Sequence, residues 1–391
     1  MNMTFKNEMR LLNKTKSGHP LKSEYGVEFS PDSMYLIRGG SLTKIQVQET
    51  FTGRTVFTSE INTLHTDRVT SCSWSKCGQF TASCGNDQRL NIYTVNMLAY
   101  PCLEWICTIK LPSSCKCVSL IQHDGKPIVV VSSGRLVYFF NLNDIKKKIE
   151  AKRKHDNNSD ENNCQRQPLI EENSTSGWCF QPLQGLTNSI YSIEFSQDTK
   201  LVAFSGLNVD QCIIYRCTLA QNEPVDQNNS IVLHHSASNL QGVWSCNWHP
   251  LNKNRIVTLS TESLMCWDIG FDQPKIVFSS KTTNNDSSIC YSKNGNFLFV
   301  GHGRTIHVYD SEKGSLVHVQ QKASKRSTWR LVSSPSGHFL ASSSWDGFLR
   351  LWTLPRECTA LKVLSLKALC LYTIGKYNLS IYSLPPMLFS P

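Results

Sequence analysis

The sequence lacks any run of about 18 consecutive apolar residues, the length that a membrane-spanning helix requires. Its start, MNMTFKNEMRLLNKTKSGHP, also lacks the apolar segment of a secretory signal. We therefore expect no membrane partner and an intracellular protein, in the nucleus, the cytoplasm or both. Its 16 cysteines are then predicted to be reduced thiols, because disulfides persist mainly in oxidising compartments.

Signatures of catalysis are missing as well. The chain has no Gly-rich phosphate loop after a strand, no HExxH and no GxSxG elbow. Neither the trio Cys72, Cys77 and Cys84 nor the pair Cys115 and Cys117 has the spacing of a zinc site. We expect no enzymatic activity, no cofactor, no metal and no small-molecule substrate. The pair His234-His235 is interpreted as part of a solvated linker rather than as a ligand pair.

The bulk composition permits a large folded core. The chain has 391 residues, 40% of them hydrophobic and 10% aromatic, which is too apolar for a disordered protein. Its formal net charge is +10. This charge is spread along the chain, so it indicates either surplus surface lysine or an acidic partner such as nucleic acid.

What the chain does contain is one unit repeated seven times. Each copy runs as a short strand, a polar turn, a second strand, another turn and a third strand, and SSSWDGFLRLW at 342–352 holds the last two strands of the clearest copy. The linking segments, such as 230–235, can supply a fourth strand. Such a unit cannot bury both of its faces alone, whereas a closed ring of units can. The residues that open the first turn of each copy are Ser30, Ser75, Gln122, Ser196, His249, Ser292 and Ser334.

The repeat resembles the WD-repeat β-propeller family over residues 23–355. The residues that carry the resemblance are the dipeptide Trp267-Asp268, the strand-ending aromatics Tyr93, Tyr215, Tyr309 and Trp352, the turn aspartates Asp87, Asp210 and Asp346, and His65 at the family's Gly-His position. The resemblance implies an all-β fold, a seven-bladed β-propeller of four-stranded antiparallel blades. Because the aspartates recur in equivalent turns, we expect them to bind backbone amides rather than to act as acids or bases.

Three segments depart from the repeat. Turn spacing widens to 74 residues between Gln122 and Ser196, which marks an insertion at about 144–186. We interpret it as a long disordered loop between blades, and DIKKKIEAKRKH at its start could form a short helix. Residues 1–22 are expected to be flexible. Residues 356–391 are expected to hold a ring-closing strand, with LKVLSL at 361–366 as the candidate, or a degenerate eighth blade, followed by a tail.

The insertion begins with six basic residues. They are Lys146, Lys147, Lys148, Lys152, Arg153 and Lys154. This basic loop could be a solvated surface, a nuclear-localisation signal or an RNA contact. Aromatic residues, on which single-stranded bases would stack, are absent from the run itself.

A second candidate site comes from the register of the repeat. The residue five positions before each first turn lies, in the family, where the inner strand begins at the mouth of the central channel. In this sequence the seven positions are Tyr25, Thr70, Cys117, Tyr191, Trp244, Ser287 and Trp329. Four are large aromatics, Arg330 follows the last, and Trp345 lies near the same rim. They are predicted either to form a platform for a protein or peptide partner or to pack between blades.

The sequence therefore predicts a non-catalytic interaction scaffold, a subunit of a multiprotein complex. One alternative is a nuclear RNA-associated subunit that uses the basic loop. The other is a substrate receptor of a cullin-type ubiquitin ligase. Receptors of that group often carry Arg two residues after a strand-ending Trp-Asp, a place taken here by Gly270 and Phe348.

Overall fold

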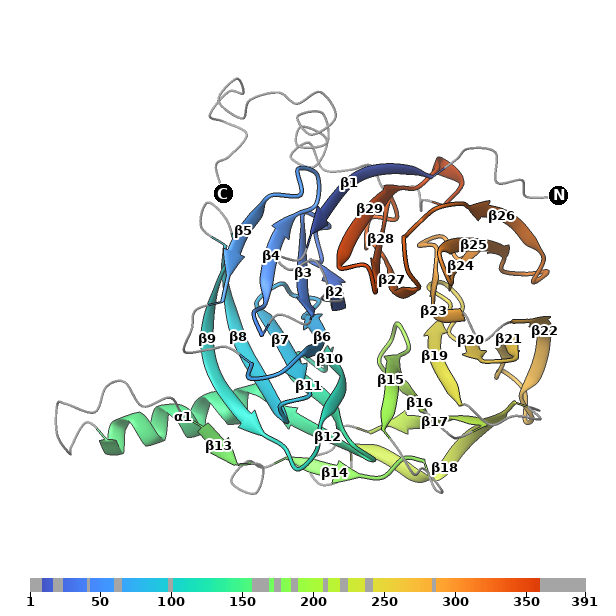
Figure 1. The fold of residues 1–391 in the computed structure, drawn as a ribbon. Coiled ribbons are helices and arrows are strands. Elements are labelled where there is room, and N and C mark those ends of the chain that lie inside the picture. Colours follow the sequence, from blue (N-terminus) through green and yellow to red (C-terminus); the bar gives the residue numbers. More distant parts are fainter. Residues whose placement is uncertain are drawn as a thin grey trace.

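Seven β-sheets surround a central axis as the blades of a ring (Figure 1). This arrangement is seen in a computed structural model, which describes residues 9–16, 24–40, 43–59, 65–97, 101–156, 169–171, 177–183, 189–206, 210–218, 224–235, 242–282 and 286–358. Within these ranges the predicted seven-bladed propeller of four-stranded antiparallel blades is confirmed.

The blades follow one another in chain order, and each is named here from its inner strand outward. Blades one to three comprise β2 (Glu24–Phe29), β3 (Tyr35–Gly40), β4 (Gln46–Glu49) and β5 (Thr55–Thr58); β6 (Val69–Trp74), β7 (Phe80–Gly85), β8 (Arg89–Met97) and β9 (Pro101–Lys110); and β10 (Cys115–His123), β11 (Lys126–Ser133), β12 (Leu136–Asn141) and β14 (Trp178–Phe180). Blades four to six comprise β15 (Ile190–Phe195), β16 (Leu201–Gly206), β17 (Gln211–Cys217) and β18 (Val225–His234); β19 (Val243–Trp248), β20 (Arg255–Ser260), β21 (Ser263–Asp268) and β22 (Lys275–Lys281); and β23 (Asp286–Tyr291), β24 (Phe297–His302), β25 (Thr305–Asp310) and β26 (Leu316–Gln320). Blade seven comprises β27 (Thr328–Ser333), β28 (Phe339–Ser344), β29 (Phe348–Thr353) and, as its outer strand, β1 (Arg10–Lys16).

The recurring turn-opening serines explain why five of the seven inner strands reverse where they do. In five blades the serine hydroxyl oxygen accepts the backbone N–H of the residue five positions later, at 2.9–3.1 Å. The third residue after the serine has a positive φ, between 58° and 79°. Glycine tolerates this conformation best, and it occupies the position in three of the five turns, as Gly78, Gly295 and Gly337.

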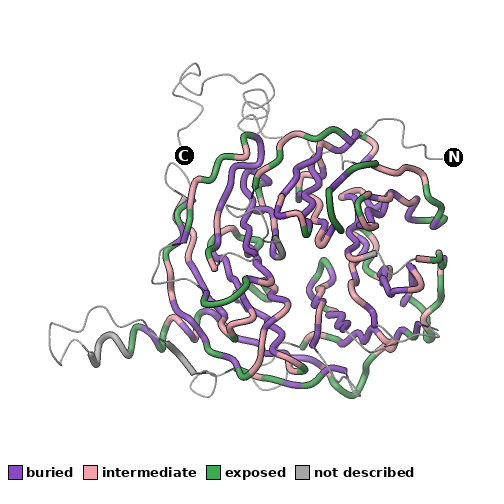
Figure 2. The backbone as a smooth tube through the Cα atoms, viewed as in Figure 1, coloured by how far each residue is buried: buried purple, intermediate pink, exposed green. Residues whose placement is uncertain are grey.

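The core is divided among the spaces between neighbouring blades. The second strand of each blade is its most buried element, and β3, β7 and β28 are buried along their whole length. Figure 2 shows the same gradient, with buried backbone inside the blades and exposed backbone around the perimeter. Because each blade packs its apolar faces on two neighbours, the ring is rigid and its central channel has fixed walls.

A strand near the N-terminus completes blade seven and so closes the ring. β1, at the N-terminus, pairs antiparallel with β29 from Arg10–Thr353 to Lys16–Phe348. Residues 10–16 therefore form a strand, although this segment was expected to be flexible. Leu11 and Leu12 supply apolar side chains in this short stretch, and Met9 is buried beside it. The candidate closing strand at 361–366 lies outside the described residues.

The insertion lies within blade three, between β12 and β14, and it is partly regular. Its predicted short helix is confirmed as α1 (Leu142–Asp156), which directly follows β12. β13 (Leu169–Glu171) then pairs in parallel with β9 and adds a fifth strand to blade two, and β14 completes blade three. Residues 157–168 and 172–176 lie outside the described ranges. A 3₁₀ turn, η4 (Arg356–Cys358), ends the described chain.

Two buried histidines form side-chain hydrogen bonds with residues that are distant in sequence. His65 contacts Asp87 through Nδ1 at 3.0 Å and Ser83 through Nε2 at 2.9 Å. His235 contacts Ser263 and Thr258 in the same way, at 3.0 and 2.7 Å. His235 was predicted to lie in a solvated linker, and that prediction is wrong, because its ring is 2% exposed. Its two hydroxyl partners lie far from it in sequence, so the contact could not be seen in the local pattern.

The turn aspartates bind backbone amides, as predicted, wherever their contacts are described. Asp87 accepts the N–H groups of Thr66 and Arg89 at 2.8 and 3.2 Å. Asp346 accepts those of Lys325 and Phe348 at 2.8 and 3.1 Å. The cysteines within the described ranges are free thiols. None of the helices described here is both long and apolar enough to cross a bilayer.

Candidate functional site

A β-bulge interrupts the start of every inner strand. We call the face of the ring at which the inner strands begin the front face, and the face at which they end the back face. The register shifts fall at Tyr25–Gly26, Thr70, Lys116–Cys117, Tyr191, Trp244, Ser287 and Trp329. All seven positions predicted at the channel mouth are among them. Because a bulge re-aims the side chain it carries, the shared bulge places these residues in equivalent positions around the front end of the channel.

Four aromatic side chains converge on a cavity of about 250 Å³ at the front face, which we call the aromatic pocket. Tyr191 and Trp244 meet across blades four and five, with ring centroids 6.0 Å apart and planes at 82°. Trp329 and Trp345 meet within blade seven, with ring centroids 5.1 Å apart and planes at 87°. Arg330 and a group of serine and threonine hydroxyls complete the lining. The pocket therefore combines apolar walls with polar groups.

A second cavity of about 200 Å³, the basic pocket, adjoins the first. It shares Tyr191, Trp329, Arg330 and Trp345 with the aromatic pocket. It adds Arg68, Thr70, Asn86 and Lys116 from blades two and three. The ammonium group of Lys116 donates to the side-chain oxygen of Asn86 at 2.7 Å, which holds the lysine across the gap between the blades. Burial is the largest cause that lowers the pKa of Lys116.

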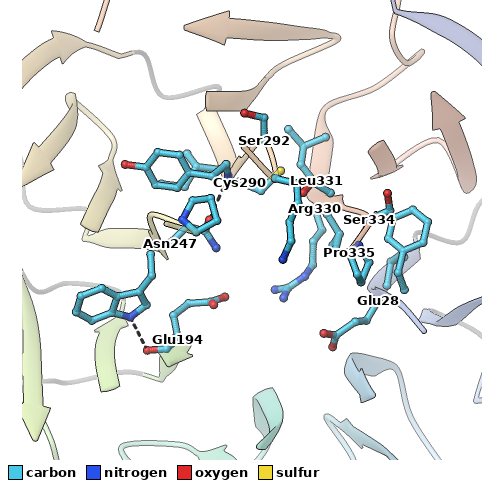
Figure 3. A pocket seen from close by; sticks show the side chains of 18 of the residues that line it. Glu28, Glu194, Asn247, Cys290, Ser292, Arg330, Leu331, Ser334 and Pro335 are labelled. Atoms are coloured by element: carbon cyan, nitrogen blue, oxygen red, sulfur yellow. Dashed lines mark hydrogen bonds between the residues drawn. The ribbon is translucent and has the colours of Figure 1, made fainter. Parts of the chain in front are cut away.

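Arg330 also reaches the central channel, a cavity of about 500 Å³ that opens toward the back face. Its guanidinium and the carboxylates of Glu28 and Glu194 point into this channel from three different inner strands (Figure 3). Burial raises the pKa of Glu28 and of Glu194 to about 7, although Arg330 acts to lower both. Burial also acts to lower the pKa of Arg330, but Cys117 and the two carboxylates outweigh this and raise it. Arg330 therefore stays positively charged near neutral pH.

The structure brings together most of the residues predicted at the channel mouth. Tyr191, Trp244, Trp329, Arg330 and Trp345 line one pocket. The side chain of Tyr25 lies outside those described. Tyr191 packs on Trp244 across a blade boundary, which is one of the two predicted roles. Trp345 is 36% exposed, and the other role, a platform for a partner, stays a prediction.

Sequence reasoning missed four charged residues of the site. Glu28 and Glu194 carried a detectable signal, since the tripeptide Glu-Phe-Ser recurs at 28–30 and 194–196, at the same register of two inner strands. A charge repeated inside a buried strand indicates a side chain that faces the channel. Arg68 and Lys116 gave no such signal, because their meeting depends on how blade two is set against blade three.

The basic run lies apart from this site, on a helix at the outer edge of the ring (Figure 1). α1 packs through the buried side chains of Leu142, Ile145 and Ile149. Lys146 places its ammonium group 4.5 Å from the ring centre of Phe80, so this lysine helps to dock the helix. Lys147 and Lys148 are exposed. The side chains of Lys152, Arg153 and Lys154 lie outside those described.

Comparison with known proteins agrees with the repeat. A family model described as "WD domain, G-beta repeat" matches residues 58–94 and 314–353, which include most of blades two and seven. The chain is also similar to the guanine nucleotide-binding protein subunit beta of Schizosaccharomyces pombe, with 30% identity over 89 residues. That segment covers 22% of this chain and 28% of the relative, so the likeness extends to well under half of either protein.

Proposed function

The chain is a WD-repeat β-propeller, a fold that generally serves as a protein-interaction scaffold, and we propose that it is a non-catalytic subunit that docks a partner protein at its front channel mouth. The observation that supports this proposal is the convergence of Tyr191, Trp244, Trp329 and Trp345 with Arg330 on one partly exposed pocket. Tryptophan, tyrosine and arginine are the residues most enriched at the energetic centres of protein interfaces.

The ring suits this role because it holds the pocket in place. The aromatic residues come from three blades. Tyr191, Trp244 and Trp329 lie at bulges in inner strands, and Trp345 precedes the turn between β28 and β29. A partner that inserts one side chain therefore meets a preformed site and loses little free energy in ordering it. The remaining loops and the outer strands stay available for other subunits.

The sequence alone supports the RNA-associated and ubiquitin-ligase alternatives. Part of the basic run is used in docking α1, because Lys146 covers Phe80. The two lysines described as exposed on that helix, Lys147 and Lys148, lie at the perimeter and not at the mouth. We therefore place the docking site at the front mouth rather than on the basic helix.

The test is affinity purification of the tagged full-length chain from its own cells, followed by identification of the retained proteins. The variant Trp244→Ala/Trp329→Ala removes two walls of the aromatic pocket. The matched control is Phe271→Ala, which removes an aromatic ring that is 53% exposed and lies outside the pocket. Circular dichroism and thermal unfolding confirm that each variant is folded.

We expect a defined set of proteins that withstands high salt, is retained by Phe271→Ala and is lost from the folded double variant. If the folded double variant keeps the whole set, the partners bind elsewhere and the proposal is wrong. If the double variant unfolds, Trp345→Ala replaces it, because Trp345 is the more exposed member of its pair.

A further inference from the structure

We propose that the front mouth selects an acidic linear peptide, in which an Asp or Glu carboxylate enters the basic pocket and a neighbouring aromatic or large apolar side chain enters the aromatic pocket. This inference rests on the proposed function and specifies the chemistry of the partner. It comes from the charges of the two adjoining cavities and from the way in which they share their walls.

The described lining of the two pockets carries cations and no carboxylate. Arg68, Lys116 and Arg330 are its charged members. The other described lining residues are aromatic, hydroxyl or amide side chains. Lys116 and Arg330 are partly buried, so the protein around them screens their charge less than water does, and the exposed Arg68 adds a third positive charge at the rim. The three cations together attract an anion. A basic peptide would meet repulsion at the same place.

The two channel glutamates do not cancel this charge. Glu28 and Glu194 line the channel behind Arg330 and are absent from the lining of both front pockets. Burial raises the pKa of each to about 7, so near neutral pH each is protonated for much of the time. Arg330 therefore presents more positive charge to the front than a fully paired arginine would.

The aromatic pocket provides the second half of the recognition. Its four rings are part of the lining of a cavity of about 250 Å³, a space suited to one large side chain. The indole N–H of Trp244 is shielded from solvent and finds no acceptor among the described residues. A peptide carbonyl or carboxylate that enters the pocket can supply the acceptor, and satisfying a buried donor favours binding.

The shared walls set the spacing of the ligand groups. Tyr191, Trp329, Arg330 and Trp345 separate the two cavities while lining both. A ligand that fills both cavities must therefore carry its anion and its apolar group side by side, as adjacent residues of an extended peptide do. Single-stranded RNA also pairs anionic and aromatic groups, so it is included as an outcome of the test.

The experiment is selection of a random linear peptide library, displayed on phage, against the immobilised full-length chain at physiological salt. We expect enriched sequences with Asp or Glu next to Trp, Phe, Tyr or Leu. A synthetic copy of the best sequence should bind about tenfold more weakly when its acid is changed to the amide. Arg68→Ala/Lys116→Ala should cause a similar loss, since it removes two of the three cations.

The control Lys147→Ala/Lys148→Ala changes the net charge equally but lies on α1, and it should bind like the wild type. Enrichment of basic or neutral apolar peptides at the mouth would overturn the acidic preference and leave the docking site intact. A phosphoserine peptide that binds where the carboxylate peptide does not would also overturn it, as would oligouridine RNA bound at the mouth in its place. Peptides that bind Trp244→Ala/Trp329→Ala as well as the wild type would refute the docking site itself.

Discussion

The indole of Trp329 meets the indole of Trp345 edge to face, with ring centroids 5.1 Å apart and planes at 87°. Two unrelated features of the backbone bring them together. Trp329 is the bulged residue of β27, and Trp345 precedes the turn between β28 and β29. Asp346 holds that turn by accepting two backbone N–H groups and pairing with Arg350. The pocket wall therefore depends on a buried ion pair that is not itself part of the pocket lining.

Replacing Trp345 with alanine should separate binding from stability. An edge-to-face aromatic contact contributes about 0.5–1.5 kcal/mol, and Trp345 is already 36% exposed, so we expect the free energy of unfolding to fall by about 1 kcal/mol. Binding of the selected peptide should fall at least about tenfold. Urea unfolding and fluorescence anisotropy measure the two effects. Equal binding by the wild type and the variant would remove Trp345 from the site.

Replacing either channel glutamate with glutamine should stabilise the protein at high pH. The folded-state pKa of about 7 lies above the ordinary value of 4.5, so the native state retains a proton that the unfolded chain releases. The stability of the wild type therefore falls as pH rises from 4.5 to 7. Glu28→Gln or Glu194→Gln should gain about 1–3 kcal/mol at pH 8, and the gain should shrink as pH falls toward 4.5. Urea unfolding across this range tests the sign, which reverses if Arg330 instead forms a net stabilising pair.

His235 should give the opposite dependence on pH. Burial lowers its pKa from 6.5 to about 4. Between these pH values the unfolded chain therefore binds a proton that the native state does not bind. As pH falls from 6.5 to 4, the wild type should lose up to about 3 kcal/mol of stability through this group. His235→Gln cannot titrate, so the difference in stability between it and the wild type should narrow as the solution is acidified. A difference that stays constant from pH 7 to pH 4.5 would show that the native state binds the proton as readily as the unfolded chain does, so that burial does not lower the pKa of His235.

Deleting residues 1–16 should open the ring at blade seven. The deletion removes β1 from β29 and removes Met9, whose side chain is 3% exposed among the residues of blades six and seven. Truncating a buried methionine alone costs about 2–5 kcal/mol, so the deletion should cost at least that much and leave β29 as an open edge. Thermal unfolding and size-exclusion chromatography report the two effects. A matched deletion of residues 361–391 tests the other candidate; if that deletion is the damaging one, β1 does not close the ring.

The sequence predicted whatever depends on spacing within one repeat. Blade number, most turn positions and the column from Tyr25 to Trp329 followed from local periodicity, because each blade forms its inner turn and its bulge from its own residues. Blade three is the exception among the turns, because Gln122, which was predicted to open the turn, still pairs with Pro127, and the turn lies at Asp124–Gly125. The bulges could not be predicted from the sequence, but they lie at the seven positions of the column. The resemblance to a known family then placed that column at the channel mouth.

What the sequence could not predict depends on contacts between distant segments. The N-terminal strand β1 finds its partner across the whole chain, at β29, and no local pattern distinguishes it from the apolar segment near the C-terminus. The basic pocket joins Arg68 and Lys116 from blades two and three to Arg330 from blade seven. His235 likewise has the sequence context of a polar linker, and its contacts with Thr258 and Ser263 are formed only in the folded chain.

The bulge that recurs in all seven inner strands has a consequence for how such a surface can change. A bulged residue takes no part in the pairing of β-strands, so its side chain can be exchanged while the hydrogen-bonded ladder stays as it is. Cys117 and Ser287 occupy the same kind of position as Trp244 and Trp329 without disturbing their blades. A position whose side chain touches no other member of the column can therefore mutate on its own at little cost to folding, whereas Tyr191 and Trp244 pack on each other and are coupled.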